Sequence, residues 1–335
     1  MIFPPTPHGL RLGLGGAALG NLFSAVTDAD AQALLAGALA SGCRTFDTAP
    51  HYGQGRSEHR FGQALQALPR DNFVLSTKVG RLLVPDASAP KEQYNFVDVL
   101  PFSQYWDYSA AGVRRSVEDS LQRLGLARLD VAYVHDCDII CHSERYPAVL
   151  AQVVHEALPE LRRMQTEGLL RHVGLGVNDV QVCLDVLRQT DVDALMLAGR
   201  YSLLDQSSLA ELLPLCSQRG VRLALGGVFN SGILATGTRA GQALFNYAAA
   251  PPEWLKRAGR LEDICQAHGV PLRAAALQFP LAHPAVDVVM VGARHQREWQ
   301  DAVNMVQHPI APNFWQALRQ AGLLPADAPV PESAA

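Results

Sequence analysis

Hydrophobic positions along the chain follow two patterns, short apolar runs and longer segments with a period near 3.6 residues. In the first helical segment, Thr27 or Asp28 can cap the start, and Gly42 follows the end. The β-like run Arg44–Asp47 comes next, so one helix leads directly into one strand. The apolar face of this helix consists of side chains at helical spacing: Leu34, Leu35, Ala38 and Leu39.

The same pairing of helix and strand recurs along the chain. After an aromatic-rich insertion, for example, Ser109 can cap a helix that ends at Gly125. Such helices separate eight β-like runs, and strict alternation of this kind indicates parallel βαβ units. The expected strands are Leu12–Gly16, Arg44–Asp47, Phe73–Lys78, Leu129–His135, His172–Gly176, Ala194–Ala198, Val221–Gly226 and Val286–Gly292.

Eight βα units in 335 residues fit a closed barrel better than an open sheet. No change in composition marks a domain boundary. We therefore predict an α/β fold, a single (β/α)₈ TIM barrel spanning residues 1–335. A long loop at 91–108 and a C-terminal helix and tail at about 311–335 complete the expected domain.

Composition narrows the class of ligand. With 48% hydrophobic residues the chain can form a large core, and a net charge of −4 offers no general attraction to nucleic acid or anionic membranes. No apolar run approaches the roughly 18 residues of a membrane span, and the six scattered cysteines are expected to be reduced thiols. These features predict a cytoplasmic protein that acts on a small molecule; the oligomeric state stays open.

Polar residues stand where several predicted strands end, which is where a (β/α)₈ barrel carries its functional groups. They are Asp47, Lys78 and His135, with Tyr52 in the loop after the second strand. Singly, they have ordinary structural interpretations, such as a helix cap, a surface lysine and a core histidine. Together they form an acid/base device, because a lysine cation would lower the pKa of a tyrosine from about 10 towards neutrality.

At these positions the chain resembles the aldo-keto reductase family. The resemblance implies a barrel that binds NAD or NADP without a Rossmann domain and transfers a hydride between the nicotinamide and a carbonyl or alcohol carbon. It assigns a catalytic tetrad to Asp47, Tyr52, Lys78 and His135, with Tyr52 as the general acid/base. Six ordered motifs carry it: Phe46–Glu58, Ser76–Gly80, Tyr133–Asp136, Gly174–Asp179, Arg200–Asp205 and Val288–Arg294.

The resemblance also implies the contacts to the cofactor. Asn178 should bond the carboxamide, Tyr201 should stack on the nicotinamide, and Ser231 and Gly232 should lie against the pyrophosphate. One position departs from the family pattern. Many members place a glutamine three residues before the stacking tyrosine, where this chain has Ala198, so the assignment of the carboxamide contacts is weaker.

The segment that begins at Gly292 and Arg294 bears on the choice between NAD and NADP. Family members that prefer NADP usually carry an arginine shortly before an acid that contacts the adenine. When Asp301 is aligned with that acid, Glu298 occupies the place of the arginine. A carboxylate repels a 2′-phosphate but can accept a hydrogen bond from a 2′-hydroxyl. NAD is therefore the expected cofactor, and NADP is possible because Arg294 and Arg297 lie nearby.

The insertion Lys91–Tyr108 offers candidate substrate contacts in Tyr94, Tyr105 and Trp106. Aromatic faces flanked by polar groups suit a polyhydroxylated ring, although a loop packed by its own aromatics is an equal alternative. Three segments, Phe102–Leu126, Tyr133–Asp138 and Leu197–Gln206, resemble the subgroup of L-fucose and D-threo-aldose 1-dehydrogenases, which has pyridoxal 4-dehydrogenase as a close relative.

This subgroup implies oxidation of the C1 hemiacetal of an aldose to a lactone, with Tyr52 accepting the hydroxyl proton. One alternative within the family is a pyridoxal 4-dehydrogenase or a general aldehyde or ketone reductase, with the same tetrad and a different pocket. Another class of function is a nucleotide-binding regulatory subunit. The complete tetrad favours an enzyme.

Two other segments have competing interpretations. His135–His142 contains two histidines, two cysteines and two aspartates, but no second distant pair of ligands, so we predict no metal site there. Gly13–Ala18 matches a dinucleotide-binding glycine motif, yet the next helix cap comes only at Thr27, too late for a Rossmann helix. The glycines are better explained as part of a first barrel strand.

Overall fold

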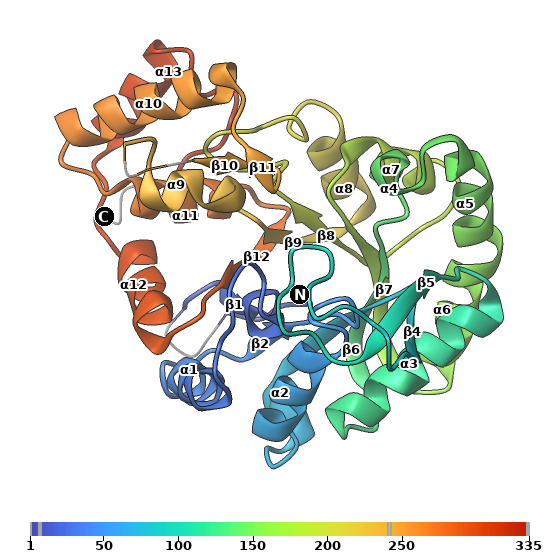
Figure 1. Ribbon diagram of the computed structural model, residues 1–335. Coiled ribbons are helices and arrows are strands. Elements are labelled where there is room, and N and C mark those ends of the chain that lie inside the picture. The colour runs from blue at the N-terminus through green and yellow to red at the C-terminus, as the bar shows by residue number, and fades with distance from the viewer. Residues whose placement is uncertain (1, 6–8, 240, 242, 333–335) are drawn as a thin grey trace.

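A computed structural model describes residues 2–5, 9–239, 241 and 243–332. In it eight parallel strands close into a barrel in the order β1-β12-β9-β8-β7-β6-β3-β2, as Figure 1 shows. All eight predicted strands are present, and the predicted (β/α)₈ barrel is confirmed. The strands are β1 (Leu12–Gly15), β2 (Thr45–Asp47), β3 (Val74–Val79), β6 (Leu129–His135), β7 (Leu170–Val177), β8 (Ala194–Ala198), β9 (Arg222–Gly226) and β12 (Val286–Gly292).

Helices surround the barrel (Figure 1), and local sequence signals set their ends. Thr27 accepts a hydrogen bond from the Asp30 amide at the start of α1, and Gly125 adopts a left-handed conformation after α3, as predicted. The helices are α1 (Asp28–Ala40), α2 (Arg56–Leu65), α3 (Ala110–Leu124), α4 (Ile139–His142), α5 (Tyr146–Gln152), α6 (Leu158–Thr166), α7 (Val180–Leu187), α8 (Leu212–Arg219), α9 (Ile233–Thr236), α10 (Pro252–Ala267), α11 (Leu272–Leu281), α12 (Gln296–Val306) and α13 (Pro312–Gln320).

Short helical turns complete the chain path. The π-helical turn Val153–Ala157 joins α5 to α6, and the 3₁₀ turn Ala18–Gly20 follows β1. Because β1 leads into this turn and α1 begins only at Asp28, the glycine-rich Gly13–Ala18 segment does not open a Rossmann helix. The remaining 3₁₀ turns are Arg70–Asn72, Ser143–Arg145 and Asn230–Gly232. None of the described helices is long and apolar enough to cross a membrane.

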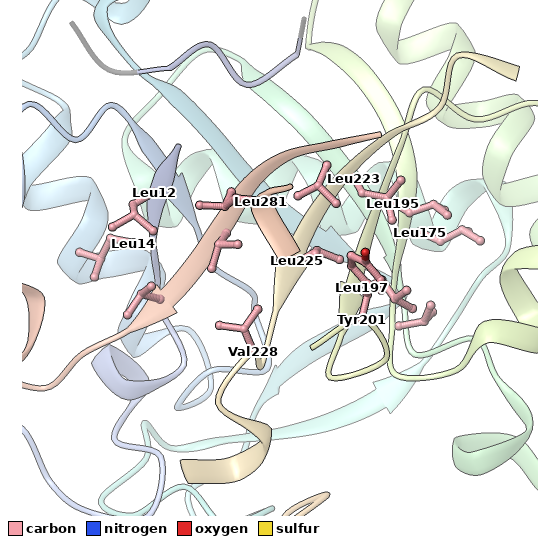
Figure 2. Close-up of a cluster of buried hydrophobic side chains, with 14 of the residues drawn as sticks. Leu12, Leu14, Leu175, Leu195, Leu197, Tyr201, Leu223, Leu225, Val228 and Leu281 are labelled. Carbon is pink, nitrogen blue, oxygen red and sulfur yellow. The ribbon is translucent and has the colours of Figure 1, made fainter. Parts of the chain in front are cut away.

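Leucines on the outer side of the strands pack against the helices (Figure 2). Because side chains alternate along a strand, the residues between these leucines face the inside of the barrel. In β8, for example, Leu195 and Leu197 belong to the outer cluster, whereas Met196 belongs to a separate inner one. The inner cluster contains Phe3, Val131, Tyr133, Ala194, Met196, Ala224, Val288 and Met290.

The insertion after β3 differs in part from the predicted long loop. Phe102–Trp106 forms β5, which pairs antiparallel with β4 (Arg81–Pro85) immediately after β3. Aromatic residues favour strands, but a strand needs a partner, and β4 was not recognised because it follows β3 so closely. A second small hairpin, β10 (Leu244–Phe245) with β11 (Ala248–Ala249), lies between β9 and α10.

All six cysteines lie in the described part of the chain and are unpaired, and their expected reduced state stays a prediction. The C-terminal segment contains the helix α13, and Trp315 on this helix is 1% exposed, so it belongs to the core.

Candidate active site

A buried ion pair occupies the mouth of the barrel, at the carboxyl ends of the strands. Asp47 is the last residue of β2, and Lys78 lies near the end of the neighbouring β3. The Lys78 Nζ atom is 2.7 Å from Asp47 Oδ2 and also donates to the Thr48 carbonyl oxygen at 2.9 Å. Ser76 Oγ donates to the other Asp47 oxygen at 2.7 Å. Lys78 is therefore held in one position by two acceptors, and Ser76 in turn holds the Asp47 carboxylate.

Tyr52 lies beside this pair, in the turn that follows β2. Lys78 Nζ is 4.9 Å from the centre of the Tyr52 ring, and the Phe96 ring stacks on the same phenol with centroids 5.9 Å apart. The turn passes close to Gly20, where a Cβ atom would overlap the Tyr52 backbone. Burial raises the pKa of Tyr52, and the cation of Lys78 opposes this rise.

His135, the last residue of β6, completes the group. The centre of its ring is 6.3 Å from that of Tyr52, and Tyr108 donates a 2.7 Å hydrogen bond to its backbone carbonyl. Burial lowers the pKa of His135 well below its usual value, and the charges of Arg81 and Lys78 lower it further, so the imidazole is neutral near pH 7. The four residues predicted as a tetrad thus meet at one end of the barrel; their catalytic role stays a prediction.

Four further polar side chains in the mouth were not among the predicted site residues. His51 Nδ1 lies 3.0 Å from Gln104 Oε1, and Arg81 pairs with Asp136 at 2.5 Å. Burial, aided by Arg81, lowers the pKa of His51 to about 3. Sequence adjacency was the available signal for three of them: His51 precedes Tyr52, Arg81 follows the Ser76–Gly80 motif, and Asp136 follows His135.

The hairpin β4–β5 presents opposite faces to the site and to the outside. Trp106 and Gln104 face the site, since Arg81 lies 3.9 Å from the Trp106 ring and Gln104 contacts His51. Tyr105 lies between them on the strand and points to the other face, where Arg115 donates to its hydroxyl at 3.3 Å. Of the three predicted substrate residues, Trp106 is therefore at the mouth and Tyr105 is not.

Tyr94, the third predicted substrate residue, lies at the edge of the mouth. Its ring is 5.3 Å from the His51 ring, and it is 57% exposed. It is thus available to a ligand that enters from solvent.

Three of the predicted cofactor residues lie on loops at the same end of the barrel. Asn178 follows β7, and its amide donates to Asp136 Oδ1 at 3.3 Å. Ser231 and Gly232, beyond β9, have φ angles of 60° and 104°, and a Cβ atom on Gly232 would meet nothing within 4 Å. The Gly232 amide donates to the Phe229 carbonyl at 3.0 Å, so the contact of this turn with a pyrophosphate stays a prediction.

The structure does not bring Tyr201 to the mouth, contrary to its expected role beside the nicotinamide. Its side chain is 1% exposed, and its ring lies 5.3 Å from Phe279 on α11 and 5.6 Å from His283. Figure 2 shows it within the leucine cluster outside the barrel. The left-handed Gly199 turns the chain after β8 and directs Tyr201 outwards.

Small residues end the strands next to this turn. Ala198 is the last residue of β8 and Gly226 the last of β9, and a Cβ atom on Gly226 would lie 3.7 Å from that of Ala198. This part of the mouth therefore carries small residues and no aromatic side chain from Tyr201.

The predicted NAD-selecting segment surrounds the start of α12. Glu298 accepts a 2.8 Å hydrogen bond from the Arg294 amide and pairs with the Arg294 guanidinium at 3.2 Å. Gly292, the last residue of β12, is exposed immediately before this pair. Asp301 is one turn further on and pairs with Arg273 at 2.8 Å. The Glu298 carboxylate and the Arg294 guanidinium thus form a pair at the start of α12, in the segment predicted to select NAD.

The segment His135–His142 brings three possible metal ligands near one another. Oxygen atoms of Asp136 and Asp138 and the sulfur of Cys141 lie within 4.8 Å of one another. Two of them have structural partners, because Asp136 pairs with Arg81 and Asp138 accepts from the Cys141 amide at 3.0 Å to cap α4. The prediction of no metal here stays a prediction.

The chain is similar to known proteins in both its sequence and its fold. The sequence pattern of the aldo/keto reductase family matches residues 11–322. Pyridoxal 4-dehydrogenase from Microbacterium luteolum is 44% identical over 326 residues, covering 93% of this chain and 94% of that protein. D-threo-aldose 1-dehydrogenase from a Pseudomonas species is 38% identical over 321 residues, covering 94% of each. A solved aldo-keto reductase from Bacillus halodurans has a TM-score of 0.71 at 24% identity, covering 95% and 93% of the two chains, and supports the fold.

Proposed function

Because this chain belongs to the aldo/keto reductase family, we propose that it is a nicotinamide-dependent dehydrogenase that oxidises a cyclic hemiacetal to a lactone. Its oxidoreductase class follows from the family and from two dehydrogenase relatives, one acting on pyridoxal and one on D-threo-aldoses. Both kinds of substrate form cyclic hemiacetals. An aldose of the L-fucose and D-threo class is the first candidate, and pyridoxal is the second, favoured by the higher identity of 44%.

The observation that carries the proposal is the buried Asp47–Lys78 pair beside Tyr52. Tyr52 as phenolate accepts the proton of the hemiacetal hydroxyl, and Lys78 stabilises the phenolate charge. Neutral His135 donates a hydrogen bond to the same substrate oxygen and orients it. When bound, the nicotinamide ring supplies the hydride acceptor.

Asn178, Ser231 and Gly232 would hold the cofactor, the first at its carboxamide and the others at its pyrophosphate. Glu298 would accept from the ribose 2′-hydroxyl, which favours NAD over NADP. Its contacts with Arg294 support this preference, because the paired guanidinium offers less charge to a 2′-phosphate. Buried Tyr201 has no part in this arrangement.

The test is reduction of NAD⁺, and separately of NADP⁺, by purified protein with L-fucose, D-arabinose, L-galactose and pyridoxal. The product should be two hydrogen atoms lighter than the substrate. Tyr52→Phe should lower kcat at least about 100-fold, the usual range for a general acid/base. Tyr105→Phe, which removes a phenol on the outer face of the hairpin, serves as the matched control and should leave kcat unchanged.

Two other outcomes would contradict the proposed mechanism or the proposed function. Full activity in Tyr52→Phe would remove the tyrosine from the mechanism. Tight cofactor binding without turnover of any sugar, aldehyde or pyridoxal would instead support a regulatory nucleotide-binding subunit.

A further inference from the structure

Arg81 is a buried cation in the barrel mouth that the proposed chemistry does not use. It is the first residue of β4 and is 9% exposed. The preceding Gly80 has a φ of 99°, and a Cβ atom there would overlap the Tyr108 ring. Only glycine fits this position, and it lets the chain reverse tightly against Tyr108. The reversal directs Arg81 into the site.

Two contacts fix the direction of the Arg81 guanidinium. It lies 3.9 Å from the centre of the Trp106 ring, and its Nη2 atom is 2.5 Å from Asp136 Oδ2. Its Nη1 atom is also 3.4 Å from His51 Nδ1. Stacking on an aromatic ring and pairing with a carboxylate are the contacts for which a planar guanidinium is suited. Arg81 is thus held between the Trp106 ring and the Asp136 carboxylate.

Asp136 connects Arg81 to the catalytic imidazole. The same Oδ2 atom that pairs with Arg81 lies 3.5 Å from His135 Nε2, and Oδ1 accepts from Asn178. The other imidazole nitrogen, Nδ1, is buried without a hydrogen-bond partner among the described residues. Nε2 is therefore the nitrogen that carries the proton in the neutral ring, because an N–H group buried without an acceptor costs more than a bare nitrogen.

A carboxylate this close to an imidazole normally stabilises the charged form. Asp136 thus favours a protonated His135 whose Nε2 proton is directed to the carboxylate rather than to the substrate. Burial of the imidazole opposes this effect most, and Arg81 on the same oxygen opposes it further. The other titratable or charged groups that face His135 are His51, Tyr52, Lys78 and, at its backbone, Tyr108.

We propose that Arg81 is a positioning residue for the reaction: by neutralising Asp136 it keeps His135 uncharged, with Nε2–H available to the substrate oxygen. The substrate part of this statement rests on the proposed function, whereas the charge of His135 can be measured without any substrate. Loss of Arg81 should let His135 gain a proton as the pH falls, and activity should fall with it.

The experiment is NMR of protein labelled with ¹⁵N-histidine, titrated between about pH 5 and pH 8, where histidine normally ionises. The His135 signal is assigned by its loss in His135→Gln. We expect no titration of His135 in the parent protein and a clear titration in Arg81→Met. The double variant Arg81→Met/Asp136→Asn should return His135 to the neutral form. Arg81→Gln provides a second neutral replacement should the methionine variant be unstable.

Kinetics supply the second readout. The kcat/KM of Arg81→Met should fall at least about tenfold at the acid end of the range and recover towards higher pH, following the fraction of neutral His135. A uniform loss at every pH would indicate a purely structural role and would contradict the proposal.

Arg70→Met is the matched control, since Arg70 pairs with Asp130 at 2.5 Å near the start of the same strand β6. It removes a similar ion pair at the far end of the strand and should leave the His135 signal unchanged. A His135 that stays neutral in Arg81→Met, or that titrates equally in Arg70→Met, would overturn the proposal. Absence of turnover in the parent protein would refute the proposed function alone.

Discussion

The environment of Tyr52 determines what its phenol can do. Burial raises its pKa, and the Lys78 cation 4.9 Å from its ring lowers it. For Lys78 itself, burial lowers the pKa, but Asp47 and Tyr52 raise it by more, so the amine stays charged. Tyr52 and Lys78 thus shift the pKa of each other.

Replacing Lys78 by methionine should move the pH dependence of the oxidation to higher pH. In the proposed reaction the base is the phenolate, so kcat/KM should rise with pH through the pKa of Tyr52. Without the cation this pKa is higher, and activity at pH 7 should fall at least about tenfold, one unit of pKa being about 1.4 kcal/mol. The measurement is kcat/KM from pH 6 to pH 10.

Two variants control this prediction. Lys91→Met removes a lysine whose side chain is 84% exposed and should leave the profile in place. Asp47→Asn/Lys78→Met removes the buried carboxylate as well, and should recover much of the stability that the single variant loses, about 3–5 kcal/mol for an unpaired buried charge. A profile unchanged by Lys78→Met would exclude Lys78 as the group that tunes Tyr52.

Glu298 offers a second prediction about a single side chain. Glu298→Gln should free the Arg294 guanidinium and remove a negative charge from the start of α12. We expect the ratio of kcat/KM with NADP to that with NAD to rise roughly tenfold, or about 1.4 kcal/mol. Glu253→Gln, in the first turn of α10, is the control. An unchanged ratio would count against the alignment of Glu298 with the 2′-position.

In the hairpin β4–β5, neighbouring residues of one strand point to opposite faces. Adjacent positions on a strand face opposite sides, so Gln104 and Trp106 reach the site while Tyr105 contacts α3. The aromatic composition of the insertion was visible in the sequence. Its division into two faces was not, because a segment treated as a loop has no predicted register.

Trp106 and Tyr105 are neighbours in the sequence, but Trp106→Ala should lower kcat/KM far more than Tyr105→Ala. Loss of Trp106 removes the ring under Arg81, a contact of about 1–2 kcal/mol when shielded from solvent, and should lower kcat/KM about tenfold. Tyr105→Ala should stay near the parent value. Steady-state kinetics with the best substrate provides the measurement, and equal losses in both variants would refute the assignment of the two faces.

Phe3 and the proposed active site lie at opposite ends of the barrel. The tetrad is at the carboxyl ends of the strands, whereas Phe3 belongs to the inner cluster together with Ala194, the first residue of β8. Val74, the first residue of β3, packs against this cluster as well. The N-terminal segment thus closes the end of the barrel that carries no proposed site.

Phe3→Ala should reduce stability without changing catalysis. Removing a fully buried phenylalanine costs about 3–5 kcal/mol through lost burial and the cavity that remains. Urea denaturation measures the loss, and kcat/KM at a temperature where the protein is folded should equal the parent value. Ile140→Ala, at a side chain that is 64% exposed on α4, is the control for stability. A large loss of kcat/KM would show that the two ends are coupled.

The sequence by itself determined the eight strands, the alternation with helices and the order of the polar residues at the strand ends. These follow from local periodicity and capping, which act over a few residues. It could not decide where a side chain points once its loop leaves the strand. Tyr201 turned outwards after Gly199, and Arg81 turned inwards after Gly80.

Only the tertiary structure decided which charged and titratable side chains lie next to one another. Arg81, Asp136 and His135 come from two strand ends, and their mutual distances depend on barrel closure, which brings β3 beside β6. The same closure sets the burial that shifts the pKa of Tyr52 and His135. Burial and charge pairing are properties of the assembled barrel, and no single segment of the chain carries them.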